Sequence, residues 1–163
     1  MKSLRYVTAM LVIGALTGTM GIARVQSPSE GLTLAEALAL IDAAETAAAG
    51  KNLLLSVAVV DGRGDLVAVA RMPGARPTTT DTAIGKAMVS AMTGRPSAST
   101  TGQGQNALYS NLNDSTGGRL RFFQGAVPVL RGGYTVGAIG ASGASAQDDE
   151  DAVTAALRAV GIR

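Results

Sequence analysis

Apolar residues recur at helical spacing in three stretches of the chain. The first begins at Thr33, a good N-cap residue with Glu36 three positions later, and ends at Gly50. The second covers 82–92. The third covers 148–160 and opens with three acidic residues, which suit the positive end of a helix dipole. A period of three to four residues predicts an amphipathic helix in each stretch.

Short apolar runs rich in β-branched residues lie between glycine turns and predict strands. The runs 53–60 and 66–70 flank Asp-Gly-Arg-Gly-Asp at 61–65, which predicts a β-hairpin. Three further candidate strands follow in the second half of the chain: 120–123, 126–130 and 135–141. Because hairpin connections favour antiparallel pairing, we expect an α+β fold class. The architecture would be a single antiparallel sheet of about five strands with flanking helices, in a two-layer domain.

The region that follows the second predicted helix, 97–114, is polar and rich in small residues. We expect one short helix near 103–111 within it. The remainder is expected to be a surface loop that is more mobile than the elements it connects. The pattern contains no internal repeat and indicates no second domain.

The N-terminus has the pattern of an export signal. Lys2 and Arg5 precede an apolar run over 7–23, and small residues occupy the positions before a cut after Ala23. An uncleaved membrane anchor and a buried N-terminal helix are the alternatives, although the run is short for a bilayer span. Export predicts a periplasmic or secreted bacterial protein, membrane-associated if the segment is retained. The chain is accordingly divided into three parts: signal peptide or anchor 1–23, linker 24–31 and domain 32–163.

The chain of 163 residues contains no histidine and no cysteine. The lack of cysteine excludes disulfides, thiolate catalysis, and iron–sulfur or thiolate zinc sites. The lack of histidine removes the commonest general base and the commonest haem and transition-metal ligand. Any catalysis would depend on carboxylates, Lys, Tyr, Ser or Thr, or on a bound cofactor. The net charge is +2 and no basic run carries interleaved aromatics, so we predict no nucleic-acid partner.

Two groups of residues have both a structural and a binding interpretation. Ser142 and Gly143 precede the last helix, where a nest of backbone N–H groups can hold an anion; capping of that helix is the alternative. Phe122 and Phe123 form the only adjacent aromatic pair. Neighbouring strand residues point to opposite faces, so one ring is expected in the core and the other at a pocket or a partner subunit.

Several motifs occur in an order that resembles one known family. They are Val59-Val60-Asp61-x-x-Gly64-x-Leu66-Val67 with Arg71-Met72-x-Gly74-Ala75, then 80–87 with Lys86-Ala87, then 125–129, 136–143 and Gln147-Asp148-Asp149. Together they are similar to the GlcG/HbpS family, also called the haem-degrading domain family, over 32–162. The resemblance implies a PAS- or profilin-like domain that assembles as dimers or higher oligomers. It also implies haem binding in some exported members, and proximity to small-molecule catabolic or redox enzymes in others.

The chain departs from this family at the residue after the hairpin-turn glycine. That residue is often His in the family, and here it is Asp65. We therefore predict no cofactor, with haem as the alternative and Tyr134 or Met72 as its candidate iron ligand. The resemblance places Arg71 and Lys86 among pocket residues. Either can pair with a carboxylate or a haem propionate, a surface ion pair being the alternative.

These observations lead to three functional hypotheses. The first is an exported, non-enzymatic GlcG/HbpS-like domain that binds a ligand or a partner. It would be a homo-oligomer or an accessory subunit of a periplasmic or membrane-bound redox complex, with membrane contact only through its N-terminal segment or its partner. The second is a haem-binding protein with a non-His ligand, and the third is an enzyme acting on a carboxylated metabolite through Lys86 and Arg71. The candidate ligand-binding residues are Arg71, Lys86, Phe123, Tyr134, Ser142 and Gly143.

Overall fold

A computed structural model describes residues 31–162 of the chain. The predicted signal peptide or anchor and nearly all of the linker therefore lie outside the described residues. The helices are α1 (Leu34–Ala49), α2 (Thr79–Thr93), α3 (Ala107–Ser115) and α4 (Ala146–Val160). The strands are β1 (Ser56–Asp61), β2 (Leu66–Arg71), β3 (Ala126–Arg131) and β4 (Tyr134–Ser142). Within residues 31–162, no helix is long and apolar enough to cross a bilayer.

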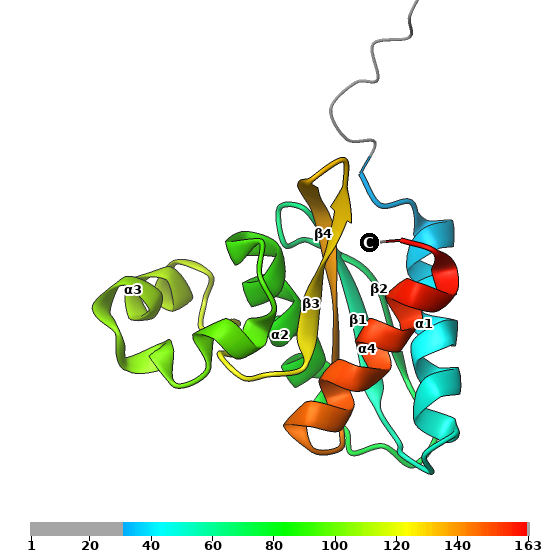
Figure 1. The fold of residues 1–163 in the computed structure, drawn as a ribbon. Helices are drawn as coiled ribbons and strands as arrows, with labels where there is room; N and C mark the ends of the chain where they lie inside the picture. The colour runs from blue at the N-terminus through cyan, green and yellow to red at the C-terminus, as the bar shows by residue number, and fades with distance from the viewer. Residues whose placement is uncertain (1–30, 163) are drawn as a thin grey trace, which may run out of the picture.

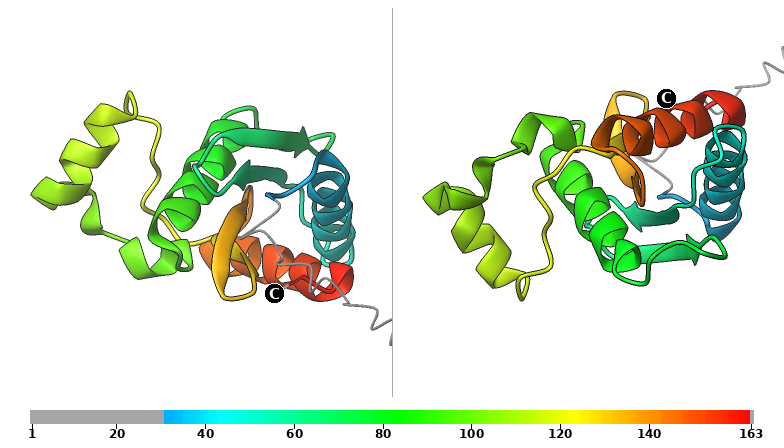
Figure 2. Two further views of the ribbon diagram at one scale, coloured as in Figure 1. Left: turned by 90° about the horizontal axis from the view of Figure 1, so that it is seen from above. Right: turned by 90° about the horizontal axis from the view of Figure 1, so that it is seen from below.

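The strands form one antiparallel sheet in the order β2-β1-β4-β3. Helices α1 and α4 pack on one face, and α2 packs on the other, chiefly over β4 and β1 (Figure 1). The α+β class and the single antiparallel sheet are confirmed. The sheet has four strands instead of about five, and helices cover both of its faces, so it is the middle layer of the domain (Figure 2).

The candidate strand at 120–123 is not a strand and pairs with none of the strands in residues 31–162. Its backbone bonds elsewhere: the Leu120 N–H donates to the Asn113 side chain at 2.8 Å, and the Arg121 N–H donates to the Gly85 carbonyl of α2 at 3.2 Å. Gly85 permits this crossing, because a Cβ there would collide with the Arg119 carbonyl. The segment is therefore held against a helix, where sequence reasoning predicted a fifth strand.

Helix α1 begins with the predicted capping box. The Thr33 side chain accepts the Glu36 N–H at 3.2 Å, and the Glu36 carboxylate accepts the Thr33 N–H at 2.9 Å. The same carboxylate lies 2.6 Å from the Arg131 guanidinium at the end of β3. These contacts, the Thr33 N–H first, hold the pKa of Glu36 below its ordinary value. One side chain thus caps α1 and ties it to the sheet.

The two faces of the sheet support different cores. Val57 and Val59 of β1 pack with aliphatic and alanine side chains from α1 and α4. Val60 points to the other face and packs with Met88 of α2 and with Phe122. This alternation follows from the two-residue period of a strand. Phe122 is thus the phenylalanine that enters the core, and Phe123 is exposed.

The polar region after α2 projects from the sheet as an arm (Figure 1). Helix α3 of the arm begins at Ala107, later than the predicted start at 103. It begins there because Asn106 caps it by accepting the Leu108 N–H at 3.0 Å. A short 3₁₀ turn, Gln103–Gln105, precedes it. No residue of α3 is buried. The edge-to-face contact of Tyr109 with Phe122, with ring centroids 5.2 Å apart, helps attach the arm to the domain.

Candidate functional site

A pocket of about 400 Å³ opens between β2, α2 and the segment that returns from the arm. This volume is typical of small-molecule sites. Residues from three separate parts of the chain line it: Leu66, Asp81, Ile84, Gly117, Gly118, Arg119 and Arg121.

The apolar wall of the pocket exists because α2 does not fully cover the edge strand β2. Helix α2 packs mainly over β4 and β1, which leaves Leu66 and Val69 of β2 exposed by 49% and 38%. A β-bulge shifts the register so that Leu66, and not Val67, lies opposite Val60. Leu66 therefore points to the α2 side of the sheet, beside Ile84.

The opposite wall is formed by Gly-Gly-Arg-Leu-Arg at 117–121. Gly117 and Gly118 have φ angles of 70° and 74°, in the left-handed region that glycine adopts most readily. The Gly118 N–H donates to the Asn113 carbonyl at 2.8 Å and so turns the chain sharply after α3. This turn brings Arg119 and Arg121 back towards α2.

The pocket carries more positive than negative charge. The Arg119 Nε donates to the Thr116 carbonyl at 3.0 Å, and one terminal nitrogen of Arg121 donates to the Gly118 and Leu120 carbonyls at 2.8 and 3.0 Å. Neither guanidinium forms an ion pair with any carboxylate of residues 31–162, and Asp81 forms none either. The lining therefore contains two guanidinium groups and one carboxylate, and the guanidinium groups keep N–H donors for a bound acceptor.

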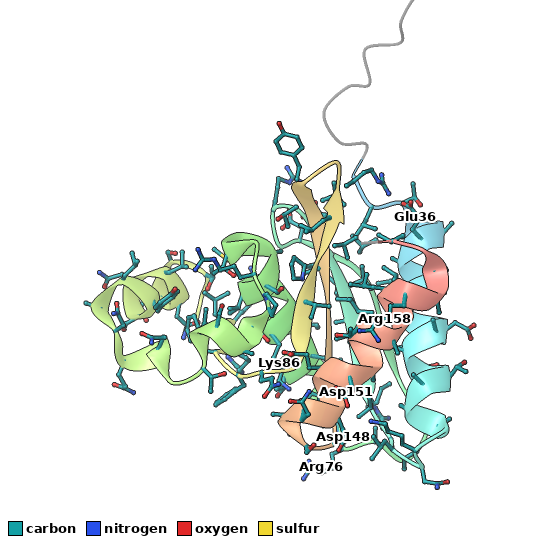
Figure 3. The ribbon with its side chains drawn as sticks, viewed as in Figure 1. Glu36, Arg76, Lys86, Asp148, Asp151 and Arg158 are labelled. Atoms are coloured by element: carbon teal, nitrogen blue, oxygen red, sulfur yellow. The ribbon has the colours of Figure 1, made fainter. Side chains whose placement is uncertain are left out.

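A second polar group lies in the interior, where Lys86 of α2 meets Asp149 of α4. The two side chains are 5% and 3% exposed, and Lys86 Nζ lies 2.8 Å from Asp149 Oδ2. Nζ also donates to the Ala141 carbonyl at 3.0 Å, and Asp149 Oδ1 accepts the Ala144 N–H at 3.1 Å. Gly125 closes over the pair, since a Cβ there would lie 2.7 Å from Nζ. The ammonium thus bonds to protein acceptors, and Figure 3 shows Lys86 between α2 and α4.

Arg71 and Ser142 lie at one end of the sheet, because both are register partners of Ser56. The Arg71 guanidinium donates to the Ala75 carbonyl at 2.6 Å. Gly143 follows at the end of β4 and packs against Leu55, with no room for a Cβ. The backbone N–H groups beyond it meet the chain's own side chains: the Ser145 hydroxyl caps α4, and Asp149 accepts the Ala144 N–H.

The other three predicted residues, Tyr134, Phe123 and Lys86, lie in different parts of the domain. Tyr134 begins β4, at the opposite end of the sheet from Ser142, and is 68% exposed. Phe123 is 56% exposed on the segment that leads from the arm to β3. Lys86 lies near Ser142 and Gly143, because it donates to the Ala141 carbonyl and its partner Asp149 accepts the Ala144 N–H. None of the six predicted residues lines the pocket.

Sequence reasoning missed Leu66, Asp81, Ile84, Arg119 and Arg121. The only available signal was Gly-Gly-Arg-Leu-Arg, two basic residues after a glycine turn. Nothing local to that segment indicates that it returns to α2 and faces β2.

The pocket does not fit a haem whose iron is ligated by the protein. Its lining contains none of the usual ligand types, His, Cys, Met or Tyr. Tyr134 lies outside it, and the Met72 sulfur accepts the Leu55 N–H at 3.3 Å beside the core, at the other end of the sheet from Tyr134. Of the groups on a haem, the lining offers partners for the propionates alone, through Arg119 and Arg121, and none for the iron. Among the described residues, no group of three His, Cys, Asp or Glu side chains is placed to hold a metal ion.

The chain is similar to several proteins of known structure. HbpS has 30% sequence identity and a TM-score of 0.72, over 82% of this chain and 92% of HbpS. The complex of PduOC with heme has 25% identity and a TM-score of 0.72, over 82% of this chain and 97% of PduOC. Klebsiella pneumoniae protein ORFY, of family DUF336, has 25% identity and a TM-score of 0.72, over 84% of this chain and 95% of ORFY.

No curated protein matches the sequence. A model of the family described as haem degrading protein, HbpS-like, matches residues 32–158. This match covers nearly the whole predicted domain and confirms the resemblance drawn from the sequence motifs. The chain therefore belongs to the HbpS-like family.

Proposed function

We propose that this protein is a non-catalytic binding domain that holds a small-molecule ligand between β2, α2 and the 117–121 segment. The observation that carries the proposal is the pocket itself, which joins apolar side chains to two guanidinium groups that have no carboxylate partner among residues 31–162. The enzyme hypothesis loses support because the Lys86 amine is enclosed by protein acceptors and lies outside the pocket.

The pocket assignment is tested by NMR. Protein labelled with ¹⁵N is titrated with a mixture of small metabolites, and the shifted backbone amides are mapped. Shifts concentrated at Gly117, Gly118 and Ile84 support the proposal. Shifts concentrated at Ser142 and Gly143 would instead support the anion site predicted from sequence, and would refute the pocket as the binding site.

Haem is the second candidate ligand. It is favoured by membership of a family described as haem-degrading, by the heme complex of PduOC, and by two arginines suited to propionates. Hemin titration followed through the Soret band tests it. If haem binds in this pocket, Arg119→Gln weakens binding, while Tyr134→Phe and Met72→Leu leave it unchanged. A loss of the Soret shift in Tyr134→Phe would show that haem binds at Tyr134, outside this pocket.

We also propose that the protein is exported and acts as a homo-oligomer or as an accessory subunit of a periplasmic or membrane-bound redox complex. The N-terminal sequence supports export, and family membership is consistent with assembly. N-terminal sequencing of protein from the native envelope tests the cut after Ala23. Native mass spectrometry of the same material distinguishes a complex with a redox enzyme from a homo-oligomer, and a lone monomer would refute both.

A further inference from the structure

The pocket has a specific charge pattern that bears on the class of its ligand. Arg119 and Arg121 contribute two positive charges and Asp81 one negative charge, which leaves one net positive charge in the lining. A single bound carboxylate would neutralise it. A guanidinium is the side chain best matched to a carboxylate, because its parallel N–H groups can donate to both oxygens.

The Arg121 guanidinium is held in position before any ligand arrives. One terminal nitrogen bonds the Gly118 and Leu120 carbonyls, while its other terminal nitrogen and its Nε form no hydrogen bond within residues 31–162. The Arg121 backbone is itself bonded to Gly85 of α2. Ordering a side chain on binding costs free energy, so a guanidinium that is already fixed binds an anion at a lower entropic cost.

The rest of the lining is suited to a hydrocarbon body. Leu66 and Ile84 form an apolar wall, and Gly117 and Gly118 leave open space where side chains would otherwise project. An apolar wall beside fixed donors favours a ligand with one charged end and one apolar end.

We propose that the pocket selects small amphipathic monocarboxylates: the carboxylate pairs with Arg119 and Arg121, and the apolar body lies on Leu66 and Ile84. This inference rests on the proposed function as a binding domain and names its ligand class. The same carboxylate chemistry occurs in a free acid and in the propionates of a porphyrin. The single net positive charge of the lining favours the free monoacid.

The test uses three probes that share one hydrocarbon chain: hexanoate, hexanamide and hexylamine. Each is titrated into the ¹⁵N-labelled protein, and the dissociation constant is read from the Gly117 and Gly118 amides. We expect hexanoate to bind at least about ten-fold tighter than hexanamide, since hydrogen bonds to a charged group contribute that much or more. Hexylamine should bind more weakly than both, because it meets the positive lining.

Three variants locate the selectivity. Arg121→Gln should bring hexanoate and hexanamide to similar affinities, and Arg121→Lys should recover only part of the difference because an ammonium lacks the bidentate geometry. Arg95→Gln removes the same charge from an exposed residue outside the lining and should leave the selectivity unchanged. A loss in Arg95→Gln equal to that in Arg121→Gln would show that only net charge matters and would overturn the assignment.

The outcomes separate this inference from the proposed function. Equal binding of hexanoate and hexanamide at the pocket amides overturns carboxylate selection and leaves the binding pocket in place. If neither hexanoate nor hexanamide shifts these amides, the proposed ligand class is wrong. The metabolite titration then decides whether the pocket is the binding site. If hemin displaces hexanoate while hemin dimethyl ester does not, the carboxylate comes from propionates and the monoacid assignment is overturned.

Discussion

Removing either partner of the Lys86–Asp149 pair should cost more stability than any other charge substitution in the described domain. The two side chains are 5% and 3% exposed, and each has a second hydrogen bond, to the Ala141 carbonyl and from the Ala144 N–H. Breaking such a pair leaves one buried charge uncompensated, which costs about 3–5 kcal/mol. For a domain of this size, that corresponds to a fall in Tm of roughly 10–15 °C.

The assay is thermal and urea unfolding followed by far-UV circular dichroism on Lys86→Met and Asp149→Asn. The double variant Lys86→Met with Asp149→Asn should lose less than the sum of the two single losses, because no charge then remains unpaired. Lys51→Met is the matched control. Lys51 pairs with two carboxylates of α4 at 3.2 Å, but its side chain is 51% exposed, so solvent screens the interaction and the change should be small.

Two outcomes would refute this reasoning. If Lys86→Met destabilises no more than Lys51→Met, the pair is not the buried link between α2 and α4 that its geometry indicates. If the double variant loses the sum of the two single losses, the two side chains act independently. The second result would assign their stabilising effect to the separate bonds with Ala141 and Ala144.

Two further predictions concern the crossing at α2 and the cap of α1. Gly85→Ala places a Cβ against the Arg119 carbonyl, so it should destabilise the domain by about 1–3 kcal/mol. It should also weaken hexanoate binding, because the pocket wall is displaced. An unchanged free energy of unfolding and an unchanged hexanoate affinity would contradict the close crossing. Because contacts with Thr33 and Arg131 lower the pKa of Glu36, this carboxylate stabilises the fold above its unfolded pKa, and the contribution is lost as pH falls through the folded pKa. Below about pH 4.5 the wild-type Tm should therefore fall more steeply than that of Glu36→Gln; parallel curves would contradict the assignment.

The parts of the fold that depend on near neighbours in the chain could be predicted from the sequence. The capping box at Thr33 and Glu36 involves residues three apart, and the hairpin turn at 61–65 joins adjacent strands. Helix α1 ends at Gly50 as predicted, although Gly50 is right-handed (φ −60°) and the left-handed residue that follows the helix is Asn52 (φ 56°). The ordered motifs were sufficient to identify the family, which the match over 32–158 confirms.

The tertiary structure decided how distant segments meet. The role of Lys86 is an example: the family resemblance suggested pairing with a ligand carboxylate, with a surface ion pair as the alternative. The structure instead pairs it in the interior with Asp149, 63 residues away. The 120–123 segment has a strand-like composition, yet its backbone bonds Gly85 because the arm returns across α2.

The sequence by itself therefore determined which helices and hairpins form, the family, and the lack of histidine and cysteine chemistry. Only the tertiary structure brought Leu66, Ile84 and Arg121 into one pocket. The physical reason is that helix caps and tight turns are formed by residues a few positions apart. The pocket exists because α2 covers β1 and β4 more fully than β2, a packing outcome that no local pattern encodes.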